Sequence, residues 1–255
     1  MADPSPAFLV VLVVSAFALP LVFMAWIRNT ARYGREPWHL VLKVFLWGAV
    51  FSVIITVVVS LIFLAILGNV ESLKEYVARR FGDPEIFIGA VIVAPFVEEA
   101  AKALGVRSGR PATQTWADGL VYGAAAGLGF SATENLLNGV IALYSPGGGP
   151  EASLAVIAIR SFSSSFLHAS ATAVTGYGIA KAWLSLRPTA FLPFYLVAVI
   201  MHASFNFLVV AGPVYFQQYG DMAELIVLAA AASFAIVAIT VVRFKLATHR
   251  PTVQR

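Results

Sequence analysis

Residues 86–104 read IFIGAVIVAPFVEEAAKAL, an apolar run that ends with two adjacent glutamates, Glu98 and Glu99, and with Lys102. A helix needs about 20 predominantly apolar residues to cross the hydrocarbon core of a bilayer, so this stretch is long enough to span it. A charged side chain at the centre of such a helix costs roughly 2.5–3.5 kcal/mol on insertion scales, and charges are rare there unless they have a function. The stretch therefore predicts a membrane-spanning helix that carries functional carboxylates.

The composition of the whole chain indicates the same class of protein. Hydrophobic residues make up 60% of the 255 residues and charged residues 12%, whereas soluble domains carry about 25% charged residues. The chain therefore predicts an all-α transmembrane bundle of about seven (seven to eight) spans, with residues 1–255 forming one membrane domain. Besides residues 86–104, the expected spans are Phe8–Ile27, Leu40–Leu67, Gly119–Tyr144, Leu154–Leu186, Thr189–Val210 and Ala223–Val242. Whether Leu154–Leu186 forms one tilted helix or two pieces stays open.

The basic residues predict how the bundle is oriented. Most of the 17 Lys and Arg residues fall in segments that lie on one side if the amino terminus is outside and the carboxyl terminus is cytoplasmic. An excess of Lys and Arg in cytoplasmic loops is the pattern that sets orientation. The net charge of +4 is explained by this distribution and requires no nucleic-acid partner. Arg160 is an exception, because it falls inside a span.

Pro95 precedes the paired glutamates by less than one helical turn. Proline lacks a backbone N–H and bends a helix, so the carbonyl of Val91, four residues earlier, is expected to lose its usual partner. Glu98 and Lys102 are spaced i, i+4 and share a helix face. One interpretation is a local ion pair near the inner boundary, where a lysine can extend to the interface, but it leaves one carboxylate unexplained.

A row of small residues marks the span at 119–144. Gly119, Gly123 and Gly127 recur every four residues, and Ser131 continues the row. Such a stripe lets another helix approach closely. The row therefore predicts helix packing, whereas Glu134, deeper in the same span, is a candidate for function.

Two later spans carry histidines with polar neighbours at i, i+4. His168 shares a face with Thr172, and His202 shares a face with Asn206. A single histidine in a helix is commonly a structural residue, but here His168, His202 and Glu134 are all expected near mid-membrane. Glu98 and Glu99 are expected nearby, somewhat closer to the inner face.

Carboxylates and imidazoles that converge in a dry bundle are typical of two chemistries. One is water activation, in which a carboxylate takes a proton while imidazoles hold a metal or stabilise an oxyanion. The other is proton or ion relay in a small-solute transporter, although no internal repeat of the transporter kind is found. A scaffold held by packing motifs alone would explain the glycines but not Glu134. Because the chain has no cysteine, thiol nucleophiles and thiolate metal sites are excluded.

Four segments resemble, in order, the signatures of the PrsW family of intramembrane proteases. They are EEAAK (98–102), GAAAGLGFSATEN (123–135), HASATAVTG (168–176) and HASFN (202–206), and they place the catalytic core at about 86–210. More distantly, the chain is similar to the type II CAAX prenyl endopeptidases of the Abi superfamily. It departs from them because Glu134 stands where they have a first histidine and Lys102 stands one residue before their arginine, which argues against prenylated substrates.

The resemblance implies a hydrolase that cuts membrane-anchored proteins, such as anti-sigma-factor-like regulators, in regulated proteolysis at the plasma membrane of a prokaryote. Family members are commonly described as metalloproteases, whereas the CAAX relatives resemble metal-free, glutamate-dependent enzymes. Two histidines and one carboxylate form the ligand set of a catalytic zinc with an open water position. Glu134, His168 and His202 are the expected ligands of a Zn²⁺ ion, and a metal-free mechanism stays open.

The resemblance and the residue types together suggest roles for four further residues. Glu98 is expected to be the general base toward water, and Glu99 an outer or alternate base. Lys102 is expected to keep the glutamate pair charged, since burial alone favours neutral carboxyl groups. Asn206 is the expected donor to the oxyanion.

Overall fold

The computed structural model describes residues 4–31, 34–216 and 220–249, and these residues form helices and no strand. The α-helices are α1 (Pro6–Thr30), α2 (Trp38–Trp47), α3 (Val53–Leu67), α4 (Glu71–Phe81), α5 (Pro84–Phe87), α6 (Ala94–Val106), α7 (Asp118–Tyr144), α8 (Pro150–Phe162), α9 (Ser164–Leu184), α10 (Leu192–Phe216) and α11 (Asp221–Thr248). Two π-helical segments, η1 (Gly48–Ser52) and η2 (Ile88–Val93), join α2 to α3 and α5 to α6. Two 3₁₀ segments, η3 (Arg107–Ala112) and η4 (Pro188–Phe191), lie after α6 and before α10.

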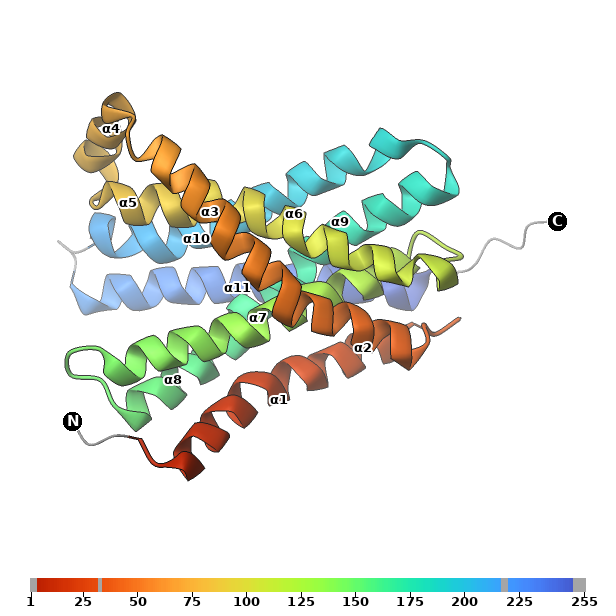
Figure 1. The fold of residues 1–255 in the computed structure, drawn as a ribbon, viewed down its shortest axis with the longest axis horizontal. Coiled ribbons are helices and arrows are strands. Elements are labelled where there is room, and N and C mark those ends of the chain that lie inside the picture. Colours follow the sequence, from red (N-terminus) through yellow and green to blue (C-terminus); the bar gives the residue numbers. More distant parts are fainter. Residues whose placement is uncertain (1–3, 32–33, 217–219, 250–255) are drawn as a thin grey trace.

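The long helices run along the long axis of an elongated bundle, with α1 beginning at one end and α11 finishing at the other (Figure 1). Five helical stretches of the described chain are long and apolar enough to cross a membrane: Pro6–Thr30, Trp38–Leu67, Pro150–Leu184, Pro188–Val210 and Leu225–Thr248. The two other expected spans correspond to α5–η2–α6 and α7, which carry the ionisable residues. The number of spans and their orientation stay predictions.

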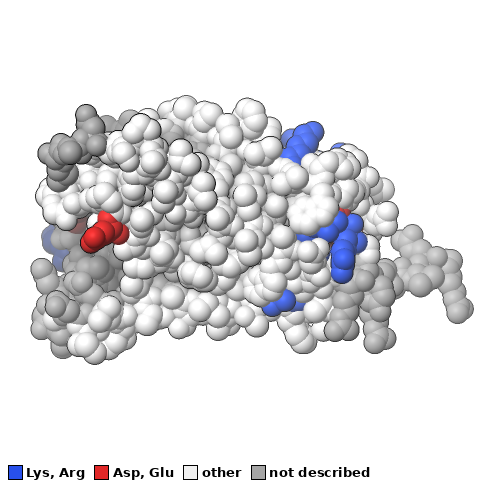
Figure 2. Space-filling view, turned by 90° about the horizontal axis from the view of Figure 1, so that it is seen from below, with Lys and Arg blue, Asp and Glu red and all other residues white. Residues whose placement is uncertain are grey.

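One face of the bundle shows where charged side chains gather. On the face shown in Figure 2 the middle of the long axis is uncharged, and Lys and Arg gather toward the end at which α11 finishes. The apolar middle exposes large side chains such as Leu61 and Val237, which are 62% and 64% accessible. An apolar belt of this kind is stable against lipid tails rather than against water.

Helix α7 is the centre of the bundle because its small residues let neighbours approach on two sides. A Cβ on Gly123 would collide with the carbonyl oxygen of Thr172 in α9. On another side of α7, a Cβ on Gly129 would collide with the carbonyl oxygen of Phe45 in α2. The predicted glycine stripe is therefore confirmed, and its partner is α9, whose own Gly176 faces Gly119.

The stretch predicted at 154–186 consists of two helices, which answers the question that the sequence left open. The break falls at Ser163, whose Oγ donates to the carbonyl of Ile159, one turn earlier. Serine hydroxyls that bond back in this way compete with the helical backbone and bend helices. The break separates α8, which carries Arg160, from α9, which carries His168.

Close packing along the glycine stripe generates the first prediction. Gly123→Ala should lower the free energy of unfolding by about 1–3 kcal/mol, the usual cost of overpacking, because the added methyl meets backbone that cannot move aside. Thermal unfolding of the detergent-purified protein measures this. Gly89→Ala is the matched control, since a Cβ there would lie at an ordinary 3.6 Å from Cδ2 of Leu64. Equal unfolding temperatures for the two variants would contradict the packing argument.

Candidate active site

The buried ammonium of Lys102 lies at the centre of a polar cluster formed by α6, α7, α9 and α10. Its Nζ is 2.9 Å from Oε1 of Glu99, 3.2 Å from Oε2 of Glu98 and 2.8 Å from Nδ1 of His168. It also lies 4.3 Å from the ring centroid of Phe130. The side chain has no accessible surface. An ion so deeply buried is tolerated only with partners of opposite charge and hydrogen-bond acceptors, and Lys102 has both.

Glu99 is fully occupied by hydrogen bonds. Its Oε1 accepts from Lys102 and from Nδ1 of His202 at 3.1 Å, and its Oε2 accepts from Oγ1 of Thr172 at 2.8 Å. The partners come from α6, α10 and α9, so this one carboxylate joins three helices. A carboxylate with both oxygens bonded in this way fixes the relative positions of the three helices.

Glu98 differs from its neighbour because its Oε2 is buried and accepts no hydrogen bond. The atom lies 3.9 Å from Nδ1 of His168 and 3.8 Å from Nε2 of His202. The two imidazole rings are perpendicular, with centroids 4.8 Å apart. The ion pair of Glu98 with Lys102 compensates part of its charge, but a buried carboxylate oxygen without a hydrogen bond is costly unless something else binds there.

The hydrogen bonds define the tautomers of both histidines. An ammonium group only donates, so Nδ1 of His168 is an acceptor, and its Nε2 carries the hydrogen that is donated to Oε2 of Glu134 at 2.8 Å. His202 donates from Nδ1 to the carboxylate of Glu99. Each ring therefore has a carboxylate on its far nitrogen and turns its other nitrogen toward Glu98.

These residues fit a catalytic metal. Among the described residues, Glu98, His168 and His202 are the group that could hold an ion, with one ligand atom from each lying within 4.8 Å of the others. Two histidines and a carboxylate are a known catalytic zinc set, and a carboxylate on the far imidazole nitrogen is the usual outer support of such ligands. The lone pair of His168 Nδ1 now accepts from Lys102, so an ion on that nitrogen requires the ammonium to withdraw toward the carboxylates.

The arrangement differs from the ligand set expected from the sequence, which named Glu134 with the two histidines. In the structure Glu98 takes that place, and Glu134 lies behind His168 on its Nε2. The reason is the orientation of the imidazole ring. Nδ1 of His168 points toward α6, and Nε2 points toward α7, where it is already bonded to Glu134.

Arg160 belongs to the cluster, although sequence reasoning assigned it no role. Its Nη2 lies 2.7 Å from Oε1 of Glu134 and donates to Ser164, and its Nε donates to Asn135. A lone arginine inside a span was the signal that could have found it. The side chains of Glu134 and Arg160 are 28% and 22% accessible, against 10% for Glu98. The cluster is therefore most open on the side of this ion pair.

The π-helical turn before α6 changes which carbonyl Pro95 leaves without a donor. In this turn Ala94 donates to Gly89, five residues earlier, so the N–H that Pro95 lacks would have met the carbonyl of Ala90 and not that of Val91. Asn206 fills the gap, because its Nδ2 donates to the Ala90 carbonyl at 2.8 Å. The amide expected to bind an oxyanion thus also repairs the backbone of the helix that carries the glutamates.

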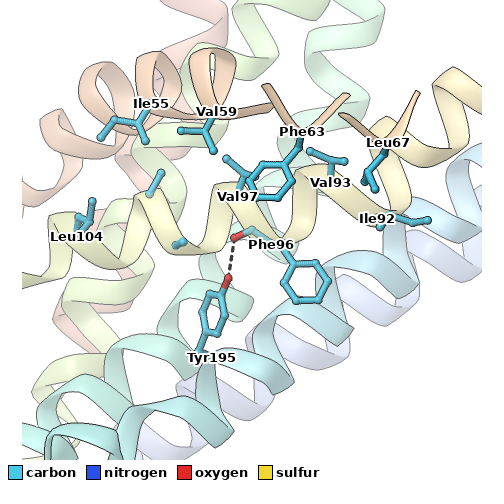
Figure 3. A pocket seen from close by; sticks show the side chains of 12 residues that line it. Ile55, Val59, Phe63, Leu67, Ile92, Val93, Phe96, Val97, Leu104 and Tyr195 are labelled. Carbon is cyan, nitrogen blue, oxygen red and sulfur yellow. Dashed lines mark hydrogen bonds between the residues drawn. The ribbon is translucent and has the colours of Figure 1, made fainter. Parts of the chain in front are cut away.

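An apolar groove lies on the face of α6 opposite the carboxylates. Phe96 and Leu104 line it, and their helical spacing puts them on the other face of α6 from Glu98 and Lys102. Its volume is about 520 Å³, and its walls come from α3, η2, α6 and Tyr195 of α10. The hydroxyl of Tyr195 donates to the Phe96 carbonyl at 2.8 Å (Figure 3). The groove and the polar cluster are therefore separate features on two sides of one helix.

Comparison with known proteins gives one family. The family described as PrsW family intramembrane metalloprotease matches residues 36–241. A curated protein named Protease PrsW, from Clostridioides difficile (strain 630), is 33% identical over 121 residues, which is 46% of this chain and 45% of that protein. The chain thus matches a little under half the length of this relative. No solved structure matches the chain.

The bond between Asn206 and Ala90 generates the second prediction. Asn206→Leu should destabilise the protein by about 1–3 kcal/mol, because a part-buried carbonyl loses its donor. In a Pro95→Ala background the restored N–H can serve Ala90 in the π-helical register, so the same change should cost much less. Unfolding of wild type, both single variants and the double variant measures the coupling. Strictly additive effects would contradict the repair role of Asn206.

Proposed function

This chain belongs to the PrsW family of intramembrane metalloproteases, and from this premise we propose that it is an endopeptidase that hydrolyses membrane-anchored proteins at the group formed by Glu98, His168 and His202. The observation that carries the proposal is Oε2 of Glu98, which is buried between two imidazole nitrogens, is ion-paired with Lys102 and accepts no hydrogen bond. Hydrolysis in a bilayer needs a water molecule held and activated away from bulk solvent, and this is the atom placed to do it.

Glu98 acts as the proton carrier in this proposal. Water forms a bond to the carbonyl carbon of the scissile peptide while its proton passes to Oε2 of Glu98, and the proton then moves to the leaving nitrogen as the C–N bond breaks. The carboxylate must be ionised to start. The ammonium of Lys102, 3.2 Å away, favours that charged form, because an opposite charge at this distance offsets the cost of burial.

In a metal-dependent mode, a divalent ion, proposed to be Zn²⁺, would be held by Glu98, His168 and His202 and would polarise the substrate carbonyl and acidify bound water, and Glu98 would then be a ligand rather than the proton carrier. Glu134 and Glu99 would then orient the two rings from behind. The same residues also permit metal-free chemistry, in which Glu98 alone activates water and the imidazoles stabilise the charged intermediate. Binding of a metal distinguishes the two.

Glu99 and Asn206 have narrower roles in this proposal than the sequence suggested. Every oxygen of Glu99 is bonded, which favours an organising role over that of an alternate base. Asn206 donates to Ala90 through Nδ2, and the second hydrogen of that nitrogen is the one that could reach an oxyanion. An anti-sigma-factor-like substrate and a location in a prokaryotic plasma membrane stay predictions that rest on the family resemblance.

The role of Glu98 gives a direct test. Glu98→Gln keeps the size of the side chain and removes the base, so proteolysis should fall by at least a hundredfold, as expected for loss of general base catalysis, with the bundle still folded. Cleavage of a set of tagged single-span membrane proteins co-expressed with the chain measures activity, and thermal unfolding measures folding. Glu75→Gln, on the exposed helix α4, is the control. A folded Glu98→Gln variant with full activity would sink the proposal.

The metal can be tested without knowing the substrate. Elemental mass spectrometry of purified protein should find about one zinc per chain, as expected for a single site, and the ion should be lost in His168→Ala and His202→Ala. The exposed His39 is the control, so His39→Ala should keep its zinc. Protein that binds no metal under conditions that retain weakly held ions would contradict the metal-dependent mode, favour glutamate chemistry and make a solute-flux assay necessary.

Lys102 supplies a second readout from the same experiment. Because its ammonium occupies the lone pair of His168 Nδ1, Lys102→Met should bind zinc more tightly than wild type, by roughly tenfold for the removal of one adjacent positive charge. Equal or weaker zinc binding by a folded Lys102→Met variant would show that the ion does not use that nitrogen.

A further inference from the structure

A second cleft lies at the end of the bundle where α6 and α9 finish. It has a volume of about 620 Å³ and lies between the α6–η3 segment and the α9–η4 segment. Its apolar walls include Leu104, Ile179, Trp183 and Phe191, and two arginines, Arg107 and Arg110, complete it. The cleft shares no residue with the cluster around Lys102.

The two arginines of this cleft have no anionic partner in the structure. Among the described residues, no carboxylate lies within ion-pair distance of Arg107 or Arg110, and no acidic residue lines the cleft. Both side chains are exposed, and the guanidinium of Arg110 lies 5.7 Å from the ring centroid of Trp183. The positive charge at this cleft is therefore uncompensated.

Two other arginines, Arg28 and Arg243, make side-chain contacts. Arg28 donates to the backbone carbonyl of Glu36 and stacks on Trp38 at 4.2 Å. Arg243 donates to Thr30 and lies 3.6 Å from the ring centroid of Trp26. Arg107 and Arg110 thus differ from these basic residues because they keep their donors free.

The cleft lies beside the ends of two membrane-length helical stretches. Two of the five membrane-length stretches, Pro150–Leu184 and Pro188–Val210, meet beside it. Between them Leu186 is 86% accessible and adopts a left-handed backbone, with φ of 54°. A leucine so exposed is costly in water but not against acyl chains. The cleft therefore combines an apolar wall with free guanidinium groups beside the ends of two membrane-length stretches, a pairing that matches the acyl chains and the charged headgroup of a lipid.

We propose that this cleft binds an anionic phospholipid from the adjoining leaflet. The phosphate lies between Arg107 and Arg110, whose planar guanidinium groups match phosphate oxygens in paired hydrogen bonds. One acyl chain lies along Leu104, Ile179 and Phe191. Basic pockets between transmembrane helices are a recurring site for acidic headgroups, and the apolar wall favours a lipid over free phosphate.

Such a lipid would contact the helix that carries the proposed catalytic glutamates. Ala103 and Leu104 line the cleft and directly follow Lys102 in α6. Binding of the lipid does not depend on proteolysis. The lipid site can therefore be tested independently of the proposed enzymatic function.

The test compares lipid binding by two matched double variants. Native mass spectrometry of detergent-purified protein should show phosphatidylglycerol binding to wild type, and Arg107→Gln/Arg110→Gln should weaken it by roughly tenfold or more, as expected for the loss of two headgroup contacts. Lys43→Gln/Lys245→Gln removes the same charge from exposed residues outside the cleft and should bind like wild type. Unfolding temperatures without lipid confirm that all proteins are folded.

Three results would overturn the assignment. The first is equal loss of phosphatidylglycerol in both double variants, which would mean that binding follows net charge alone. The second is phosphatidylcholine binding as tight as phosphatidylglycerol binding in wild type. The third is inorganic phosphate that competes fully with the lipid, which would make the cleft a site for free phosphate.

Discussion

The buried ammonium of Lys102 is the constraint on which the rest of the polar cluster depends. A cation without accessible surface must keep its partners, because removing one member of a buried ion pair typically costs about 3–5 kcal/mol. Its contacts with Glu98, Glu99 and His168 tie α6 to α9, and Glu99 extends the tie to His202 in α10. These ion pairs and hydrogen bonds thus fix the register of three helices, which apolar contact with lipid alone would not do.

Close backbone packing makes this charged cluster possible. The glycines of α7 bring that helix against the backbone of α9, and the row ends at Gly127, which faces the carbonyl of His168. Two turns further along α7, Glu134 is then near enough to accept from the same histidine at 2.8 Å. A larger residue in the stripe would separate the helices, and the carboxylate would no longer support the ring.

Irregular backbone at two places directs the remaining polar side chains. The break at Ser163 follows Arg160, which meets Glu134, and the π-helical turn before Pro95 leaves a carbonyl that Asn206 satisfies. π-helical turns are frequent at functional sites because they redirect side chains within a continuous helix. The deviations from a regular helix therefore lie next to the residues proposed to carry the chemistry, while the regular helices carry the apolar surface.

The sequence by itself determined the class of fold, the glycine stripe and the shared face of Glu98 and Lys102, because apolar length and i, i+4 spacing are properties of single helices. Only the tertiary structure decided that Glu98, rather than Glu134, faces both histidines, and that Arg160 supports Glu134. Those choices depend on which face of one helix meets another and on breaks at Ser163 and before Pro95. Helical spacing places residues on a common face, but the rotation and direction of each helix are determined by packing between helices.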